Sequence, residues 1–183
     1  MNKIIFSIFL VISCIFCQCK SAEDDRPICI YKKSGKTIEQ QFPFNQSDRI
    51  EIVSYDSRND TVGNLILDGR FIVNDIYDLV VLNKPQTDSL FSLLYDYERN
   101  KNAGPVRYAD CYNPRHSVVF YKAGKAIAFW EICLECGGQR QTANTEFDKF
   151  CHENTCRIQE LFINAGIKDG IIPEQCASTK NNP

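Results

Sequence analysis

The chain has 183 residues, with 21 basic and 23 acidic side chains and a formal net charge of −2. Because there is no basic excess, the composition argues against nucleic acid and anionic lipid head groups as partners. The length suffices for one domain with a real hydrophobic core, and not clearly for two.

The N-terminal segment has the pattern of an export signal. One charged residue, Lys3, precedes an apolar run at positions 4–16. A helix that spans a bilayer needs about 20 apolar residues, so this run is too short to be an anchor helix. We therefore expect a signal peptide and export of the chain.

The end of this run resembles the lipobox of bacterial lipoproteins, because Val11-Ile12-Ser13-Cys14 places a small residue before a cysteine. The resemblance implies cleavage before Cys14 and lipidation of that cysteine, with palmitate among the expected acyl groups. The alternative is ordinary signal cleavage after Ser21 or Ala22, which would leave a soluble secreted protein. Since the apolar run ends where the lipobox lies, we favour a lipid anchor in a membrane of the cell envelope, on its periplasmic or cell-surface face.

The rest of the chain is expected to form one domain between two short flanks. Residues 1–13 form the signal peptide, 14–26 a polar tether, 27–176 the domain and 177–183 a disordered tail. Removal of the signal peptide takes away only Lys3 among the charged residues and leaves a net charge of about −3.

Short apolar runs between turn residues fill the first part of the domain. The runs ICIY, QFPF, RIEIVSY and DLVVLN are strand candidates, and NLILDGRFIV predicts a strand or hairpin around Asp68-Gly69.

A helix follows these strands. One apolar stripe at helical spacing consists of Leu90, Leu93, Leu94 and Tyr97. Asn83 and Gln86 predict a capping box at its start. The composition of residues 100–104, NKNAG, predicts that the helix ends there.

The stretch from Cys111 to Cys136 predicts a β-hairpin. Its strands are rich in β-branched and aromatic residues, and Ala123-Gly124 suits a two-residue turn between them. In the register set by that turn, His116 lies opposite Glu131 and Cys111 opposite Cys136. A β-bulge would shift the register by one residue.

A second helix is expected over residues 145–165. Phe147, Cys151 and other apolar residues gather on one side, and Gly166 suits the position just past the end. Asn154 falls on the apolar stripe and should need a hydrogen-bond partner. Together the elements predict an α+β fold, in which two main helices pack on a mainly antiparallel sheet.

Ten cysteines in an exported chain predict disulfides. Cys14 is assigned to lipid. On one helix, Cys151 and Cys156 would point about 140° apart and could not bond to each other. Cys151 should point into the core, where Cys133 or Cys136 could meet it. The expected pairs are Cys156 with Cys176 and Cys111 with Cys136.

Cys133 and Cys136 also have the two-residue spacing of thiol–disulfide exchange proteins. Such proteins lower the pKa of one thiol at a helix N-terminus, whereas Gly137-Gly138 follows here. A structural disulfide is therefore favoured over redox activity.

The same two cysteines, with Cys151-His152 and Cys156, could be read as a tetrahedral zinc site. A zinc site is disfavoured for two reasons. Cys151-His152 and Cys156 are expected on different faces of the helix, and an oxidising compartment favours disulfides over zinc binding. We expect no metal and no cofactor.

His116, Glu131 and Cys133 would share one sheet face in the expected register. This set suggests a cysteine nucleophile with a histidine base oriented by a carboxylate. A cross-strand His–Glu pair at a sheet end is favoured, because no motif supplies an oxyanion hole.

The motif Cys111-x2-Pro114-Arg115-His116, with Phe120-Tyr121, Gly124-Lys125 and Ile132-Cys133-x2-Cys136, resembles a group of lipoproteins from Bacteroidota-type bacteria. The later LFINAGI fits the same group. Because no activity is assigned to that group, the resemblance implies an exported, lipidated protein and no catalytic residue.

The sequence therefore predicts a lipid-anchored, disulfide-stabilised envelope domain that binds an unidentified protein or small molecule without catalysis. The alternative is a thiol-dependent envelope enzyme that uses Cys133 and Cys136, or Cys133 with His116.

Overall fold

The predicted strands RIEIVSY and DLVVLN and the two strands of the predicted Cys111–Cys136 hairpin lie in one central sheet. The run ICIY forms a strand outside that sheet, and the prediction of a strand at QFPF (residues 41–44) is wrong, because these residues form a turn. The computed structural model describes residues 27–56, 64–104, 112–147, 150–151, 154–172 and 176. Within them, five antiparallel strands lie in the order β5-β2-β7-β8-β9. Their bounds are Arg49–Tyr55 for β2, Ile76–Val81 for β5, His116–Lys122 for β7, Lys125–Ile132 for β8 and Gln139–Gln141 for β9.

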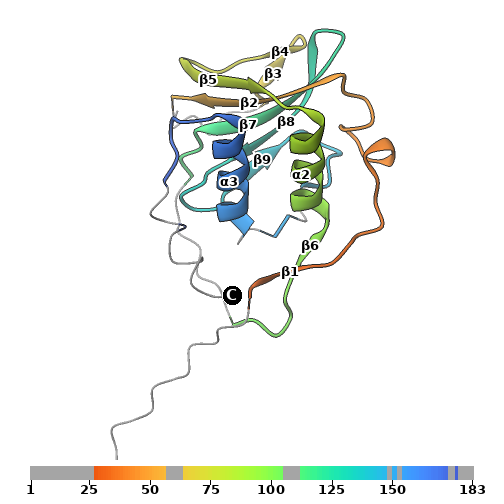
Figure 1. Cartoon of the computed structure of the whole chain (residues 1–183). Coiled ribbons are helices and arrows are strands. Elements are labelled where there is room, and N and C mark those ends of the chain that lie inside the picture. Colours follow the sequence, from red (N-terminus) through yellow and green to blue (C-terminus); the bar gives the residue numbers. More distant parts are fainter. Residues whose placement is uncertain are drawn as a thin grey trace, which may run out of the picture.

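Two helices, α2 (Lys84–Tyr95) and α3 (Thr155–Ala165), lie side by side on one face of this sheet (Figure 1). The main core lies between the two layers. It includes Ile52, Val118, Phe120 and Trp130 from the sheet, and Leu90, Leu94, Ile158 and Phe162 from the helices. The fold is therefore a single α+β domain, as the sequence predicts.

The opposite face of the sheet is partly covered by a short hairpin of β3 (Ile66–Leu67) and β4 (Arg70–Phe71). Its turn lies at Asp68-Gly69, where the sequence predicts a strand or hairpin, and these two residues have positive φ angles of 52° and 74°. A second, smaller apolar cluster forms beneath it from Val53, Tyr55, Val119 and Ala126, with Ile66 and Phe71 packed against them.

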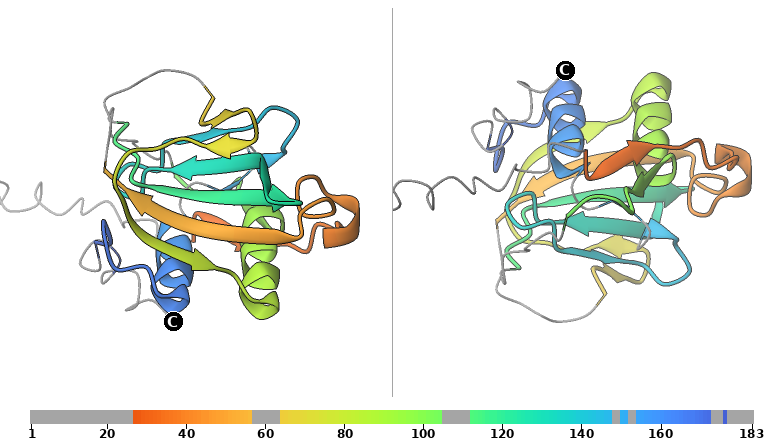
Figure 2. Two further views of the ribbon diagram at one scale, coloured as in Figure 1. Left: turned by 90° about the horizontal axis from the view of Figure 1, so that it is seen from above. Right: turned by 90° about the horizontal axis from the view of Figure 1, so that it is seen from below.

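A separate antiparallel pair joins β1 (Cys29–Tyr31) to β6 (Tyr97–Arg99). It lies at the end of the helices away from the β3–β4 hairpin, and is nearest the viewer in the right-hand view of Figure 2, which shows the molecule from below. A 3-10 turn, η1 (Ile38–Gln40), follows β1.

The start of α2 is predicted correctly and its end is not. The capping box is confirmed, since Gln86 N donates to Asn83 Oδ1 (3.0 Å) and Asn83 N donates to Gln86 Oε1 (2.9 Å). The helix ends at Tyr95, because the chain then extends to pair with β1. Tyr97 is therefore a strand residue of β6 and not part of the helical stripe.

The second helix is shorter than predicted, because α3 begins at Thr155 and not near residue 145. Phe147 and Phe150 reach the core from irregular backbone and pack against Trp130, with ring centroids 6.2 and 5.3 Å away. Gly166 ends α3 with φ 116°, as expected. Asn154 stands just before the helix, and its buried Nδ2 has no hydrogen-bond partner within the described chain.

The β7–β8 hairpin has the predicted turn, with Lys122 opposite Lys125. A bulge between Phe120 and Tyr121 then shifts the register by one residue, so the predicted pairing of His116 with Glu131 is wrong. His116 lies opposite Ile132, and Ser117 lies opposite Glu131. In this register the side chains of Ala128, Trp130 and Ile132 lie in the main core on the helix-covered face, and Glu131 lies on the other face, outside the main core.

Candidate functional site

His116 and Glu131 lie on opposite faces of the sheet, so the structure does not bring together the predicted cysteine–histidine–carboxylate set. His116 faces the helices and is 1% exposed. Its Nε2 lies 2.9 Å from the carbonyl oxygen of Asp169, and its ring packs against Phe162. Burial lowers the pKa of His116 below its ordinary value. The residue therefore acts as a neutral packing residue of the core.

Gly170 makes this packing possible. It has φ 66°, and a Cβ on it would lie 2.8 Å from His116 Cε1. A larger residue would be strained by its backbone and would also press on the imidazole ring.

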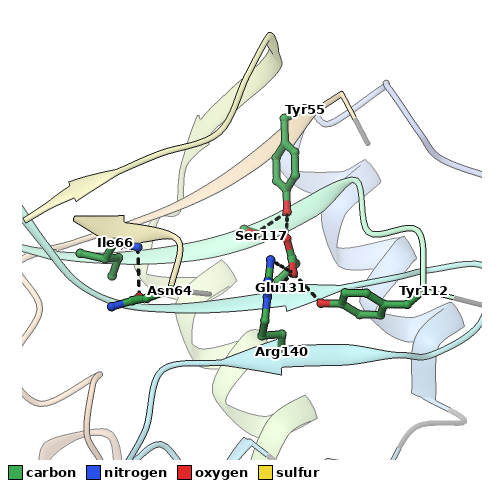
Figure 3. Close-up of polar contacts among 7 residues, drawn as sticks. All are labelled: Tyr55, Asn64, Ile66, Tyr112, Ser117, Glu131 and Arg140. Carbon is green, nitrogen blue, oxygen red and sulfur yellow. Dashed lines mark hydrogen bonds and ion pairs between the residues drawn. The ribbon is translucent and has the colours of Figure 1, made fainter. Parts of the chain in front are cut away.

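Glu131 is the centre of a buried polar cluster on the opposite face (Figure 3). The side chain is 2% exposed, and both carboxylate oxygens accept hydrogen bonds. Tyr55 donates to Oε1 at 2.5 Å and Tyr112 donates to Oε2 at 2.5 Å. Arg140 adds a two-point contact with Oε2, through Nε at 2.9 Å and a terminal nitrogen at 2.8 Å.

Ser117 completes this cluster at 3.0 Å from the Tyr55 hydroxyl. Because the single proton of Tyr55 is donated to Glu131, the Ser117 hydroxyl is the donor to Tyr55. Burial, followed by the charge of Glu131, raises the pKa of Tyr55 far above its ordinary value. Burial and the hydrogen bond to Glu131 do the same for the pKa of Tyr112. Both phenols therefore remain protonated donors.

The Glu131 cluster suits a structural role better than proton transfer. Its carboxylate is covered by three side chains whose donors all point at it, as Figure 3 shows. A general base needs an accessible oxygen within hydrogen-bond reach of a substrate. Buried carboxylates paired in this way hold elements together.

The partners of Glu131 are not marked by any sequence motif. Arg140 is the one partner that the sequence could have revealed. Gly137-Gly138 separates β8 from β9, and continued strand pairing across this turn places Arg140 opposite Glu131. The contributions of Tyr55 and Tyr112 depend on the order of strands in the sheet, which the sequence does not give.

Cys133 and Cys136 form the second cluster, in the turn between β8 and β9. Both are buried, and their sulfur atoms lie 2.7 Å apart. Burial raises the pKa of the Cys133 thiol, and the hydrogen bond with Cys136 adds to this effect. A raised pKa is the opposite of what a reactive thiol needs.

Two disulfides lie within the described residues. One joins Cys156 to Cys176, the pairing expected from the sequence. The other joins Cys29 of β1 to Cys151, so the expectation that Cys151 meets Cys133 or Cys136 is wrong. The reason is that Cys151 precedes α3 on irregular backbone, where it faces β1 and not the sheet.

The disulfides also remove two ligands of the candidate zinc site, because Cys151 and Cys156 are each bonded to another cysteine. Among the described residues, no group of three or more His, Cys, Asp or Glu side chains is placed to hold a metal ion. Cys14, Cys111 and His152 lie outside the described residues. None of the helices in the described part of the chain combines the length and apolar character needed to cross a membrane.

Comparison with known proteins gives no match to a protein-family model, a curated protein or a solved structure. The fold and its clusters thus define the chain as a disulfide-stabilised α+β domain.

Proposed function

We propose that this protein is an exported, lipid-anchored domain of the cell envelope that binds an unidentified protein or small-molecule ligand and catalyses no reaction. The observation that carries the proposal is the pair of disulfides, Cys29–Cys151 and Cys156–Cys176. Disulfides persist in oxidising compartments outside the cytosol, which agrees with the apolar N-terminal segment and the lipobox at Cys14.

The geometry of the candidate catalytic groups supports the non-catalytic part of the proposal. His116 and Glu131 are on opposite sheet faces, and each is at most 2% exposed. Burial raises the pKa of Cys133 and so disfavours its thiolate. These groups hold the fold together and do not converge on one reacting atom.

The test of the anchor is the substitution Cys14→Ala in the full chain, expressed in a bacterium that processes lipoproteins. The unmodified sequence should take up labelled palmitate and sediment with membranes, and C14A should lose both properties. Cys17→Ala and Cys19→Ala are matched controls from the same segment and should behave like the unmodified chain. Palmitate labelling that survives in C14A, or an unmodified chain found only in the medium, would contradict the proposal.

Thiol-dependent chemistry is the second candidate, because the Cys133 and Cys136 sulfur atoms meet. It predicts that the native protein reduces an added disulfide such as dithiobis(nitrobenzoate), and that Cys133→Ser abolishes this reaction without unfolding the domain. Our proposal predicts that Cys133 and Cys136 of the native protein do not react with this reagent.

A further inference from the structure

The turn between β8 and β9 places two thiols against each other. Gly137 N donates to the Cys133 carbonyl oxygen, and Cys133 N donates to the Gly138 carbonyl oxygen, each at 2.8 Å. These bonds fix the backbone on both sides of the two cysteines. Their sulfur atoms are 2.7 Å apart, beyond a covalent S–S bond of about 2.05 Å and closer than two sulfur atoms pack without bonding.

We propose that Cys133 and Cys136 form a further disulfide of the mature protein, closed inside the β8–β9 turn. This inference rests on the proposed export, which supplies the oxidising compartment. Closure requires a small approach of the two side chains and leaves the hydrogen-bonded backbone of the turn in place. The bond is structural and takes no part in a catalytic cycle.

Closure is a two-electron oxidation. The two thiols lose two protons and two electrons as the S–S bond forms, and the disulfide of a thiol oxidase accepts them and becomes two thiols. Cys133 and Cys136 are 1% and 8% exposed once the domain has folded. Oxidation therefore occurs before the turn is fully buried, and the closed bond is then shielded from reductants.

The other described cysteines do not compete for this pair. Cys29, Cys151, Cys156 and Cys176 are joined to each other in two disulfides. Among the cysteines outside the described residues, which also include Cys17 and Cys19, Cys111 is the strongest competitor, because the backbone of its near neighbour Asn113 hydrogen-bonds to the Cys133 sulfur. The test must therefore separate a Cys133–Cys136 bond from the Cys111–Cys136 bond that the hairpin pattern predicts.

The same turn supports the Glu131 cluster. A Cβ on Gly138 would lie 2.9 Å from Tyr112 Cδ2 and 3.6 Å from the Cys136 sulfur, so the Tyr112 ring rests directly on this backbone. Tyr112 in turn donates to Glu131. A closed turn therefore fixes the backbone against which the ring of Tyr112, one of the three partners of Glu131, packs.

The experiment is disulfide mapping of the full chain, isolated without reductant and labelled with N-ethylmaleimide in denaturant before digestion with trypsin. Cleavage after Lys125 and Arg140 leaves both cysteines in one peptide, residues 126–140. We expect this peptide unlabelled, lighter by two hydrogen atoms than its reduced form, and able to take up two labels only after reduction. A peptide that is labelled before reduction, or linked to the peptide that holds Cys111, overturns the inference.

Two variants sharpen the result. Cys111→Ser should leave the bond in peptide 126–140 intact, and the inference fails if Cys136 becomes labelled in that variant. Cys133→Ser should expose Cys136 to the label. The inference also fails if Cys136 stays blocked in C133S, because Cys136 would then have another partner.

The same digest separates this inference from the proposed function. If Cys29–Cys151 and Cys156–Cys176 are closed while Cys133 and Cys136 are labelled, the further disulfide is refuted and export stands. If all three pairs are reduced, export to an oxidising compartment is refuted. Oxidised glutathione added during refolding of the purified chain then tests the pair directly, and closure within peptide 126–140 is the expected result.

Discussion

Glu131 shows at the scale of one residue how a charge is held in a sheet. Each carboxylate oxygen accepts a phenolic hydrogen bond, and Arg140 supplies the compensating positive charge. A buried carboxylate without such partners would be costly, since its hydration is lost on folding. The cluster connects β2, β8, β9 and the segment before β7 through a single side chain.

The substitution Arg140→Met should lower the free energy of unfolding by about 3 kcal/mol, because it leaves a buried carboxylate without its counter-charge. Urea unfolding of the two proteins measures the difference. Arg70→Met, at an exposed position of β4, is the matched control and should change stability by less than about 0.5 kcal/mol. Equal effects of the two substitutions would show that Arg140 does not neutralise Glu131.

His116 should make the stability of the domain depend on pH. Burial lowers its pKa in the folded state, against an ordinary value of about 6.5 in the unfolded chain. The facing charges are Asp169 and Asp78, which oppose the shift, and Arg115, which adds to it. The stabilising contribution is complete above about pH 6.5 and is lost as the pH falls toward the folded pKa, because the unfolded chain takes up the proton first.

Urea unfolding between about pH 8 and pH 5 should therefore show stability falling at low pH, by up to about 1.4 kcal/mol per pH unit from this group. His116→Gln should flatten the decline. The only other histidine in the sequence, His152, provides the matched variant His152→Gln. An H116Q variant with the full decline would show that His116 is not the titrating group.

At the scale of single elements, local sequence signals decide where helices and turns begin, and pairing decides where they end. The capping box at Asn83 and the Ala123-Gly124 turn depend on neighbouring residues and are predicted correctly. The end of α2 depends on the distant strand β1, which takes Tyr97 into a sheet. The bulge in the β7–β8 pair is a departure from regular pairing, and the spacing of residues does not show where such a departure falls.

The substitution Asn83→Ala should cost about 1 kcal/mol of unfolding free energy, because it removes the side-chain acceptor at the start of α2. Thermal or urea unfolding would measure this loss. Asn83→Asp keeps an acceptor at the same place and should restore most of the stability. A loss of the same size in N83A and N83D would indicate an effect other than capping.

At the scale of the whole molecule, the two disulfides join segments that lie far apart in the sequence. Cys29–Cys151 spans 122 residues and connects β1 to the segment before α3, whereas Cys156–Cys176 spans 20 residues. A longer loop restricts the unfolded chain more strongly, so the two bonds should differ in their contribution to stability.

The double substitution Cys29→Ser with Cys151→Ser should lower the free energy of unfolding by about 5 kcal/mol, against about 3 kcal/mol for Cys156→Ser with Cys176→Ser. Urea unfolding without reductant gives both values. The reverse order would show that local strain or residual structure in the unfolded chain outweighs loop length.

The sequence by itself determined the class of fold, the β7–β8 turn and the cap of α2, and it suggested the Cys156–Cys176 pairing without fixing it. The first three features depend on side-chain periodicity and local backbone preferences. Only the tertiary structure decided that His116 and Glu131 face opposite ways, that Cys151 bonds to Cys29, and that Tyr55 and Tyr112 meet at Glu131. Each of those outcomes depends on strand order, on a bulge or on a contact between distant segments, and residue spacing along one chain carries no information on these.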